Sequence, residues 1–138
     1  MDALEAVMKI ASHGLQAQSL RLRVVAENIA NANSTASVPG GDPFRRKTVV
    51  FDQIMDRATG AELVTIKNIG VDRSDFLEVH DPGHPSAGAD GMVLMPNVKP
   101  LIEMTDMREA SRSYQANLNV IEQARSMVMS TVDLLRRA

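Results

Sequence analysis

The last third of the chain, residues 101–135, is the feature that most constrains the fold. No proline or glycine follows Pro100, and the apolar residues recur at the spacing of one helix face. A helix of this length would extend about 50 Å, which is too long to bury its stripe in a core built from the remaining residues. A second helix must therefore run beside it. The stripe comprises Met104, Met107, Tyr114, Leu118, Ile121, Val128, Val132 and Leu135.

The first thirty residues supply that second helix. Apolar residues fall there at alternating steps of four and three, which is a heptad pattern in which only Gln18 is polar. The two ends of the chain therefore predict two long helices that pair as a coiled-coil-like stalk. The heptad positions are Leu4, Met8, Ala11, Leu15, Gln18, Leu22, Val25 and Ile29.

Two features of the N-terminal helix have more than one interpretation. Gly14 lowers helix stability by about 1 kcal/mol relative to alanine. It either marks a weak point or lets another backbone approach closely. Asn28, Asn31 and Asn33 crowd the end of the helix. They can stop the helix, because asparagine competes with helical hydrogen bonds. Their amides can also bond to neighbouring helices in an assembly, and the two interpretations are compatible.

The middle of the chain predicts strands. Residues 34–43 are turn and loop formers, and short runs of β-branched and aromatic residues follow at 44–51, 62–72, 76–79 and 92–95. We therefore expect an α+β fold in which a small antiparallel β unit of three to five strands is inserted between the terminal helices. The expected parts are an N-terminal helix at 1–33, a flexible loop at 34–43, a β domain at 44–99 and a C-terminal helix at 100–138.

The composition argues against several function classes. The net charge is −2 and no basic block stands out, whereas nucleic-acid binding needs clustered Lys and Arg. No apolar run is long enough for a transmembrane helix, and the N-terminus lacks the apolar region of a cleaved signal peptide. Cysteine is absent, so disulfides and thiol chemistry are excluded. We expect no nucleic-acid partner and no membrane insertion.

One loop raises the question of a metal site. His80 and His84 lie four residues apart, with Asp75, Asp81 and Asp90 nearby, and these are metal-ligating residue types. Prolines and a glycine interleave the two histidines, however, which favours a turn with solvent-facing side chains. No nucleophile with a base and no phosphate loop is found. We therefore expect no enzyme, no cofactor and no small-molecule substrate, and a metal-dependent protein using this loop remains the alternative.

Several motifs in a fixed order give the chain a resemblance to a known family. HGLQAQSLRLRVVAENIANANS at 13–34 resembles the N-terminal signature of the bacterial flagellar axial proteins, which include the rod and hook subunits. DPGHPSAGADGMVLMPNV at 81–98 and EMTDMREASRSYQAN at 103–117 are similar to the C-type branch of basal-body rod proteins. The resemblance covers nearly the whole chain.

The resemblance implies a non-enzymatic subunit of the proximal rod, located in the basal body within the periplasmic space. It further implies export through the flagellar type III apparatus without a cleaved signal, and partners that comprise further copies, other proximal and distal rod proteins and the rod–MS-ring junction protein. Helical assembly would proceed through the terminal helices. The residues expected at that interface are Leu15, Leu22, Asn28, Ile29, Asn31, Met107, Tyr114, Asn117, Leu118, Ile121 and Val128.

Overall fold

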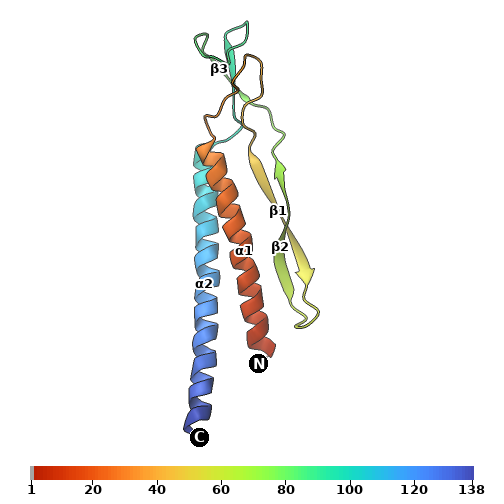
Figure 1. Cartoon of the computed structure of the whole chain (residues 1–138), viewed down its shortest axis with the longest axis vertical. Coiled ribbons are helices and arrows are strands. Elements are labelled where there is room, and N and C mark those ends of the chain that lie inside the picture. Colours follow the sequence, from red (N-terminus) through yellow and green to blue (C-terminus); the bar gives the residue numbers. More distant parts are fainter. Residues whose placement is uncertain (1) are drawn as a thin grey trace. The chain divides into compact units, whose positions relative to one another are not determined.

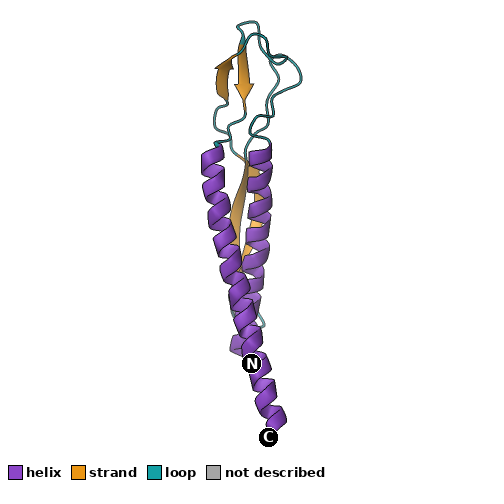
Figure 2. Cartoon of the chain, turned by 90° about the vertical axis from the view of Figure 1, so that its left-hand side faces the viewer, coloured by secondary structure: helices purple, strands orange, loops and turns teal. Residues whose placement is uncertain are grey.

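Two terminal helices flank four strands in the computed structural model, which describes residues 2–138 (Figure 1). The helices are α1 (Asp2–Ala30) and α2 (Pro100–Arg137). The strands are β1 (Lys47–Met55), β2 (Glu62–Val71), β3 (Leu77–His80) and β4 (Met92–Met95). The α+β architecture expected from the sequence is confirmed: two long helices (Figure 2) are separated in the sequence by four short or medium strands.

The strands form two separate two-stranded sheets, β1 with β2 and β3 with β4. β3 and β4 pair antiparallel, with Leu77 opposite Met95 and His80 opposite Met92. The sequence pattern pointed to one β unit because it shows where strands lie and not which strands pair. A two-stranded sheet is at best marginally stable alone, so each sheet depends on its surroundings.

Contacts divide the chain into two compact units. The helix-pair unit comprises the residues up to Leu22, Phe51–Lys67 and Glu109–Ala138, and the junction unit comprises Arg23–Val50 and Asn68–Arg108. In the helix-pair unit, Arg21 of α1 is ion-paired with Glu109 of α2, and Gly14 faces Asn117. The later residue of α1, Arg21, lies beside the earlier residue of α2, Glu109. The two helices therefore run antiparallel there.

The end of α1 is capped by its own side chains. The helix ends at Ala30, and residues 31–33 form a turn. The Asn31 side chain donates to the Glu27 carbonyl over 2.8 Å and accepts from the Ser34 hydroxyl over 3.0 Å. The Glu27 carbonyl also accepts the backbone N–H of Asn31 over 3.0 Å, so both the backbone and the side chain of Asn31 bond to the last turn of α1. This is the helix-stop role that the asparagine cluster suggested.

Neither helix offers a membrane-crossing segment. Across residues 2–138, α1 and α2 are long enough but not apolar enough to pass through a bilayer.

Candidate assembly interface

Small residues form the centre of the seam between α1 and α2 in the helix-pair unit. Ala11, Ala17, Ala110 and Ala124 are 0–3% exposed. A Cβ atom built on Gly14 would lie 2.7 Å from Nδ2 of Asn117, which is closer than van der Waals contact allows. Gly14 therefore leaves room for a side chain of α2: the atoms nearest to it belong to the amide of Asn117 and not to another backbone.

The larger apolar residues expected at the assembly interface are only half-buried within the chain. A close seam of small residues leaves part of each large side chain on the flanks of the helix pair, where another subunit can cover it. These half-buried residues are Leu15, Leu22 and Ile29 on α1 and Met107, Tyr114, Leu118, Ile121 and Val128 on α2.

The three asparagines expected at that interface make hydrogen bonds within their own chain. Asn28 is 1% exposed; it donates to the Lys47 carbonyl and accepts from the Lys47 amide, both over 2.9 Å. Asn31 caps α1, as described above. Asn117 donates to the Ser113 carbonyl over 2.9 Å. Their amides thus organise the fold that presents the apolar flanks.

Glu103 is the centre of the junction unit. Its side chain is fully buried, and a buried carboxylate is costly unless it is paired and hydrogen-bonded. Asn28 donates to it over 3.2 Å, and the Arg46 guanidinium donates to it and forms an ion pair with it. One carboxylate therefore ties the end of α1 and the chain leading into β1 to the start of α2.

Further charges support this junction. Arg46 also lies 3.7 Å from a carboxylate oxygen of Asp72 and 3.6 Å from one of Asp106. Hydrogen bonds from the backbone and hydroxyl of Ser74 lower the pKa of Asp72, with a smaller contribution from the charge of Arg46. The arginine therefore sits among three carboxylates.

A second link joins the end of α1 to the start of β1 at the surface. The Lys47 ammonium donates to Glu27 over 2.8 Å. This hydrogen bond and the charge of Lys47 lower the pKa of Glu27. Exposed pairs of this kind contribute little to stability, so Asn28 and Glu103 carry most of the attachment of α1 to the chain entering β1.

The turn between β1 and β2 is attached to α1 in the helix-pair unit. The Lys9 ammonium donates to Asp56 over 3.0 Å, and the Thr59 hydroxyl donates to the same carboxylate over 2.7 Å. The Thr59 bond, followed by that of Lys9, lowers the pKa of Asp56 from 3.8 to about 2. The bonds to Asp56 and then Glu5 raise the pKa of Lys9.

The loop between β3 and β4 has the geometry of a turn. Nδ1 of His84 accepts from the Ser86 amide over 3.1 Å and lies 2.7 Å from the Ser86 hydroxyl. Gly91 has a positive φ of 76° and lies against the His80 ring. Within residues 2–138 no three His, Cys, Asp or Glu side chains are grouped to hold a metal ion. The alternative of a metal site in this loop is not favoured.

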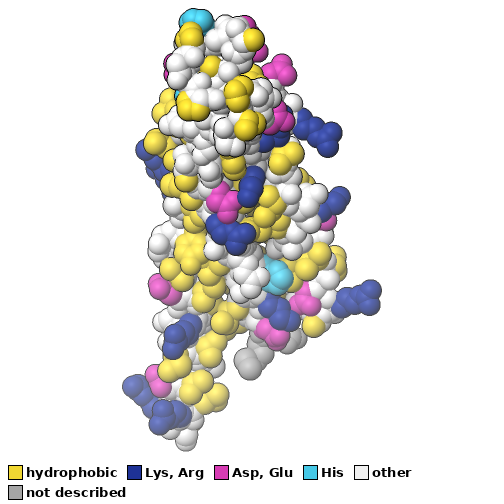
Figure 3. All heavy atoms as spheres, turned by 45° about the horizontal axis from the view of Figure 1, so that its top comes forward, with side chains coloured by type: hydrophobic (Ala, Val, Ile, Leu, Met, Phe, Trp, Pro, Cys, Tyr) yellow, Lys and Arg dark blue, Asp and Glu magenta, His cyan; other side chains and the backbone are white. Residues whose placement is uncertain are grey.

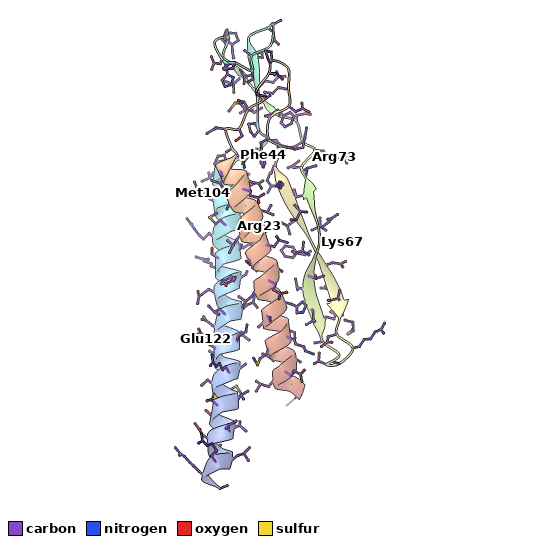
Figure 4. All side chains as sticks on the ribbon, in the orientation of Figure 1. Arg23, Phe44, Lys67, Arg73, Met104 and Glu122 are labelled. Atoms are coloured by element: carbon purple, nitrogen blue, oxygen red, sulfur yellow. The ribbon has the colours of Figure 1, made fainter. Side chains whose placement is uncertain are left out.

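Many large apolar side chains remain exposed on both helices and on the β1–β2 sheet (Figure 3). On α2, Met104, Val132 and Leu135 belong to the stripe read from the sequence, yet they are 53%, 42% and 73% exposed. Met104 and Glu122 both project away from α1 (Figure 4). Exposed apolar patches on this scale mark protein–protein interaction sites.

Three buried residues of α2 were not among the interface residues expected from the sequence. Glu103, Ala110 and Ala124 lie at intervals of seven together with Asn117, which was expected there. The stripe was chosen by large apolar side chains, so an acidic residue and two alanines did not count toward it. Their seven-residue spacing was the available signal, because a heptad repeat marks a helix seam whatever the residue type.

Two family models match the terminal parts of the chain. Residues 8–36 match the model of the flagella basal body rod protein family, and residues 89–134 match that of the flagellar basal body rod FlgEFG protein C-terminal family.

Relatives are similar over nearly their full length. The flagellar basal-body rod protein FlgC of Agrobacterium fabrum is 60% identical over 136 residues, covering 99% of this chain and 98% of that protein. FlgC of Salmonella typhimurium is 44% identical over 96% of this chain and 98% of its own length. FlgC of Borreliella burgdorferi is 36% identical, covering 94% and 95%. The chain therefore belongs to the FlgC family of flagellar basal-body rod proteins.

Proposed function

We propose that this protein is a structural, non-enzymatic subunit of the proximal rod of the flagellar basal body, where it forms part of the drive shaft for motility. The observation that carries the proposal is the full-length similarity to proteins named as basal-body rod proteins, at up to 60% identity over 99% of the chain. The rod resists torque through packing between subunits, and this role requires no catalytic residue.

Assembly proceeds through the flanks of the terminal helices. Their half-buried apolar side chains, such as Leu22 and Leu118, are covered on one side by the chain itself and on the other side by a neighbouring subunit. Side chains exposed in the single chain add to that surface, among them Val7, Ile10, Val120 and Met127. A helical rod needs contacts between unlike patches that do not close into a ring, and two helices with different exposed residues supply them.

The neighbours are further copies of this chain, the other proximal and distal rod proteins and the rod–MS-ring junction protein. The subunit reaches the periplasmic space through the flagellar type III export apparatus without cleavage of a signal peptide. Membership in the rod family supports both statements, which are parts of the proposal.

Deletion and complementation test this function. A strain that lacks the gene is complemented with the full chain carrying an affinity tag, and basal bodies are purified. We expect the deletion to abolish motility, the complemented strain to swim, and the protein to copurify with the rod. Absence of the protein from intact basal bodies of swimming cells would refute the proposal.

A further inference from the structure

A groove in the helix-pair unit lies between α1 and the β1–β2 sheet. It has a volume of about 480 Å³ and is lined by Gln18, Phe51, Asp52, Gln53 and Val64. Gln18 is the polar residue that interrupts the heptad pattern of α1, and its Oε1 atom is buried without a hydrogen-bond donor among residues 2–138. A buried acceptor that lacks a donor is unfavourable, so Gln18 can gain a hydrogen bond from an occupant of this groove.

The lining defines the chemistry of an occupant. Phe51 and Val64 form apolar walls and are 41% and 37% exposed. The Asp52 carboxylate accepts a hydrogen bond from the neighbouring amide of Gln53 and makes no ion pair within residues 2–138. An arginine fits this combination, because its guanidinium can donate to the carboxylate and to the Gln18 amide while its flat face lies against the phenyl ring. Flexible torsions of Gln18 let its amide turn toward such a donor.

The C-terminal end of α2 carries both arginines and exposed apolar side chains. Every residue from 129 to 138 is exposed, including Leu134 at 69% and Leu135 at 73%. Arg136 and Arg137 follow in the last helical turn and make no ion pair within the described part of the chain. This end therefore combines unpaired guanidinium groups with uncovered apolar side chains, as the groove requires.

The end of α2 cannot reach the groove of its own chain. The contacts of Gly14 with Asn117 and of Arg21 with Glu109 place Gln18 beside the part of α2 near Ser113. Arg136 lies more than twenty residues further along a continuous helix, which is a distance of about 35 Å at about 1.5 Å per residue. The occupant must come from another molecule.

We propose that the groove formed by Gln18, Phe51, Asp52, Gln53 and Val64 receives the C-terminal end of α2 from a second copy of this chain. Arg136 or Arg137 of that copy pairs with Asp52 and donates to Gln18, and Leu134 and Leu135 cover the apolar walls. Because the two surfaces differ, each copy offers one groove and one helix end, and the contact continues from copy to copy. The inference rests on the proposed rod function and names one contact within it.

Cysteine cross-linking in purified basal bodies tests the contact. The natural chain has no cysteine. A double variant, Gln53→Cys with Arg136→Cys, therefore carries only these two thiols. Oxidation should give dimers and higher multimers of the chain. The matched control joins Arg136→Cys to Ser12→Cys, which lies in a different groove, lined by Leu4, Met8 and Val128.

Either of two results would overturn the inference while leaving the rod function intact. One is incorporation of the double variant, Gln53→Cys with Arg136→Cys, into basal bodies without multimers after oxidation. The other is efficient cross-linking of the Ser12→Cys control in its place. Absence of the unmodified chain from basal bodies would instead refute the proposed function.

A charge exchange provides an independent test that does not depend on cysteine chemistry. Asp52→Arg alone, or Arg136→Glu with Arg137→Glu, should lower recovery of the chain in basal bodies about tenfold, which corresponds to about 1.4 kcal/mol. Combining all three substitutions should restore recovery, because the ion pair is rebuilt in reverse. If the combined variant assembles no better than the single ones, the pairing is wrong.

Discussion

Glu103 shows how a single residue specifies the junction unit. Its buried carboxylate accepts from Asn28 and pairs with Arg46, so it joins three segments that are far apart in the sequence. Removing one partner of a buried ion pair leaves the other charge uncompensated, at a cost of about 3–5 kcal/mol. Arg46 would keep Asp72 and Asp106 as neighbours, which places the expected loss at the lower end of that range.

Glu103→Ala should therefore lower the free energy of unfolding by about 3 kcal/mol, measured by urea denaturation of the purified chain. Glu122→Ala on the exposed side of the same helix is the control and should change the stability by about 0.5 kcal/mol or less. Equal effects of the two substitutions would mean that the buried pair does not organise the junction.

Asp56 gives the turn between β1 and β2 a defined pH dependence. The pKa of its carboxyl is lowered from 3.8 to about 2 in the folded chain. A group whose pKa is lowered by folding stabilises the fold above its unfolded pKa, and it loses that contribution as the pH falls through the folded value. The attachment of this turn to α1 should therefore weaken between pH 3.8 and about 2.

The titration of Asp56 can be followed by NMR through the chemical shift of its side-chain carboxyl carbon. The hydrogen bond from the Thr59 hydroxyl is the largest cause of the lowered pKa of Asp56. Thr59→Val should therefore move the titration midpoint of Asp56 upward. Asp56→Asn should remove the corresponding step from the pH dependence of thermal unfolding. An unchanged midpoint in Thr59→Val would show that the hydroxyl bond is absent in solution.

At the scale of the elements, Gly14 of α1 leaves room for the side chain of Asn117 on α2. A side chain there would meet the amide of Asn117, and overpacking of this kind costs about 1–3 kcal/mol. Gly14→Val should destabilise the helix-pair unit by that amount, measured by chemical denaturation. Asn117→Ala should recover most of the loss when combined with Gly14→Val, because it removes the atoms that clash.

The double-mutant cycle separates this contact from helix propensity. If the effects of Gly14→Val and Asn117→Ala simply add, the loss comes from the β-branched residue in the helix and not from the close approach of the two helices.

The extent of the elements could be predicted from the sequence, but their partners could not. The helix pattern placed the C-terminal helix close to Pro100–Arg137, and the four strand runs correspond to β1 to β4, because periodicity and residue type are local signals. Pairing of the strands into two sheets depends on contacts distant in sequence. The seam at Ala110 and Ala124 was likewise hidden, because alanine gives a weak apolar signal while permitting the closest helix approach.

At the scale of the whole molecule, the sequence predicted the two long helices better than the contacts of their individual residues. Leu15, Leu22 and Leu118 were expected at a subunit interface, and they are half-buried in the single chain. Asn28 and Asn117, expected at the same place, make hydrogen bonds within the chain. One sequence cannot distinguish a residue buried by its own chain from one buried by a neighbour, since both follow the same helical spacing.

Leu118 provides the direct test of assembly through the helix flanks. Burial of a leucine side chain stabilises by about 1.5–3 kcal/mol, and because Leu118 is half-buried in the single chain, a neighbour can supply the remainder. An aspartate at this position loses the stabilisation from burial of the leucine side chain. It also places a charge in an apolar contact, where desolvation is costly. We expect Leu118→Asp to yield an exported protein that fails to enter the rod, and cells that do not swim.

The matched control is Ala116→Asp, since Ala116 lies two residues away and is exposed on α2. It introduces the same charge on another side of the helix and should leave most of the motility intact. Both variants are compared by swimming assay, by recovery in purified basal bodies, and by urea denaturation of the isolated chain. Denaturation distinguishes a failed subunit contact from an unfolded protein, because a folded, exported Leu118→Asp chain that is missing from basal bodies has lost only its neighbour. Normal incorporation of that variant would mean that this flank of α2 does not contact another subunit, and that the rod is held together by other surfaces.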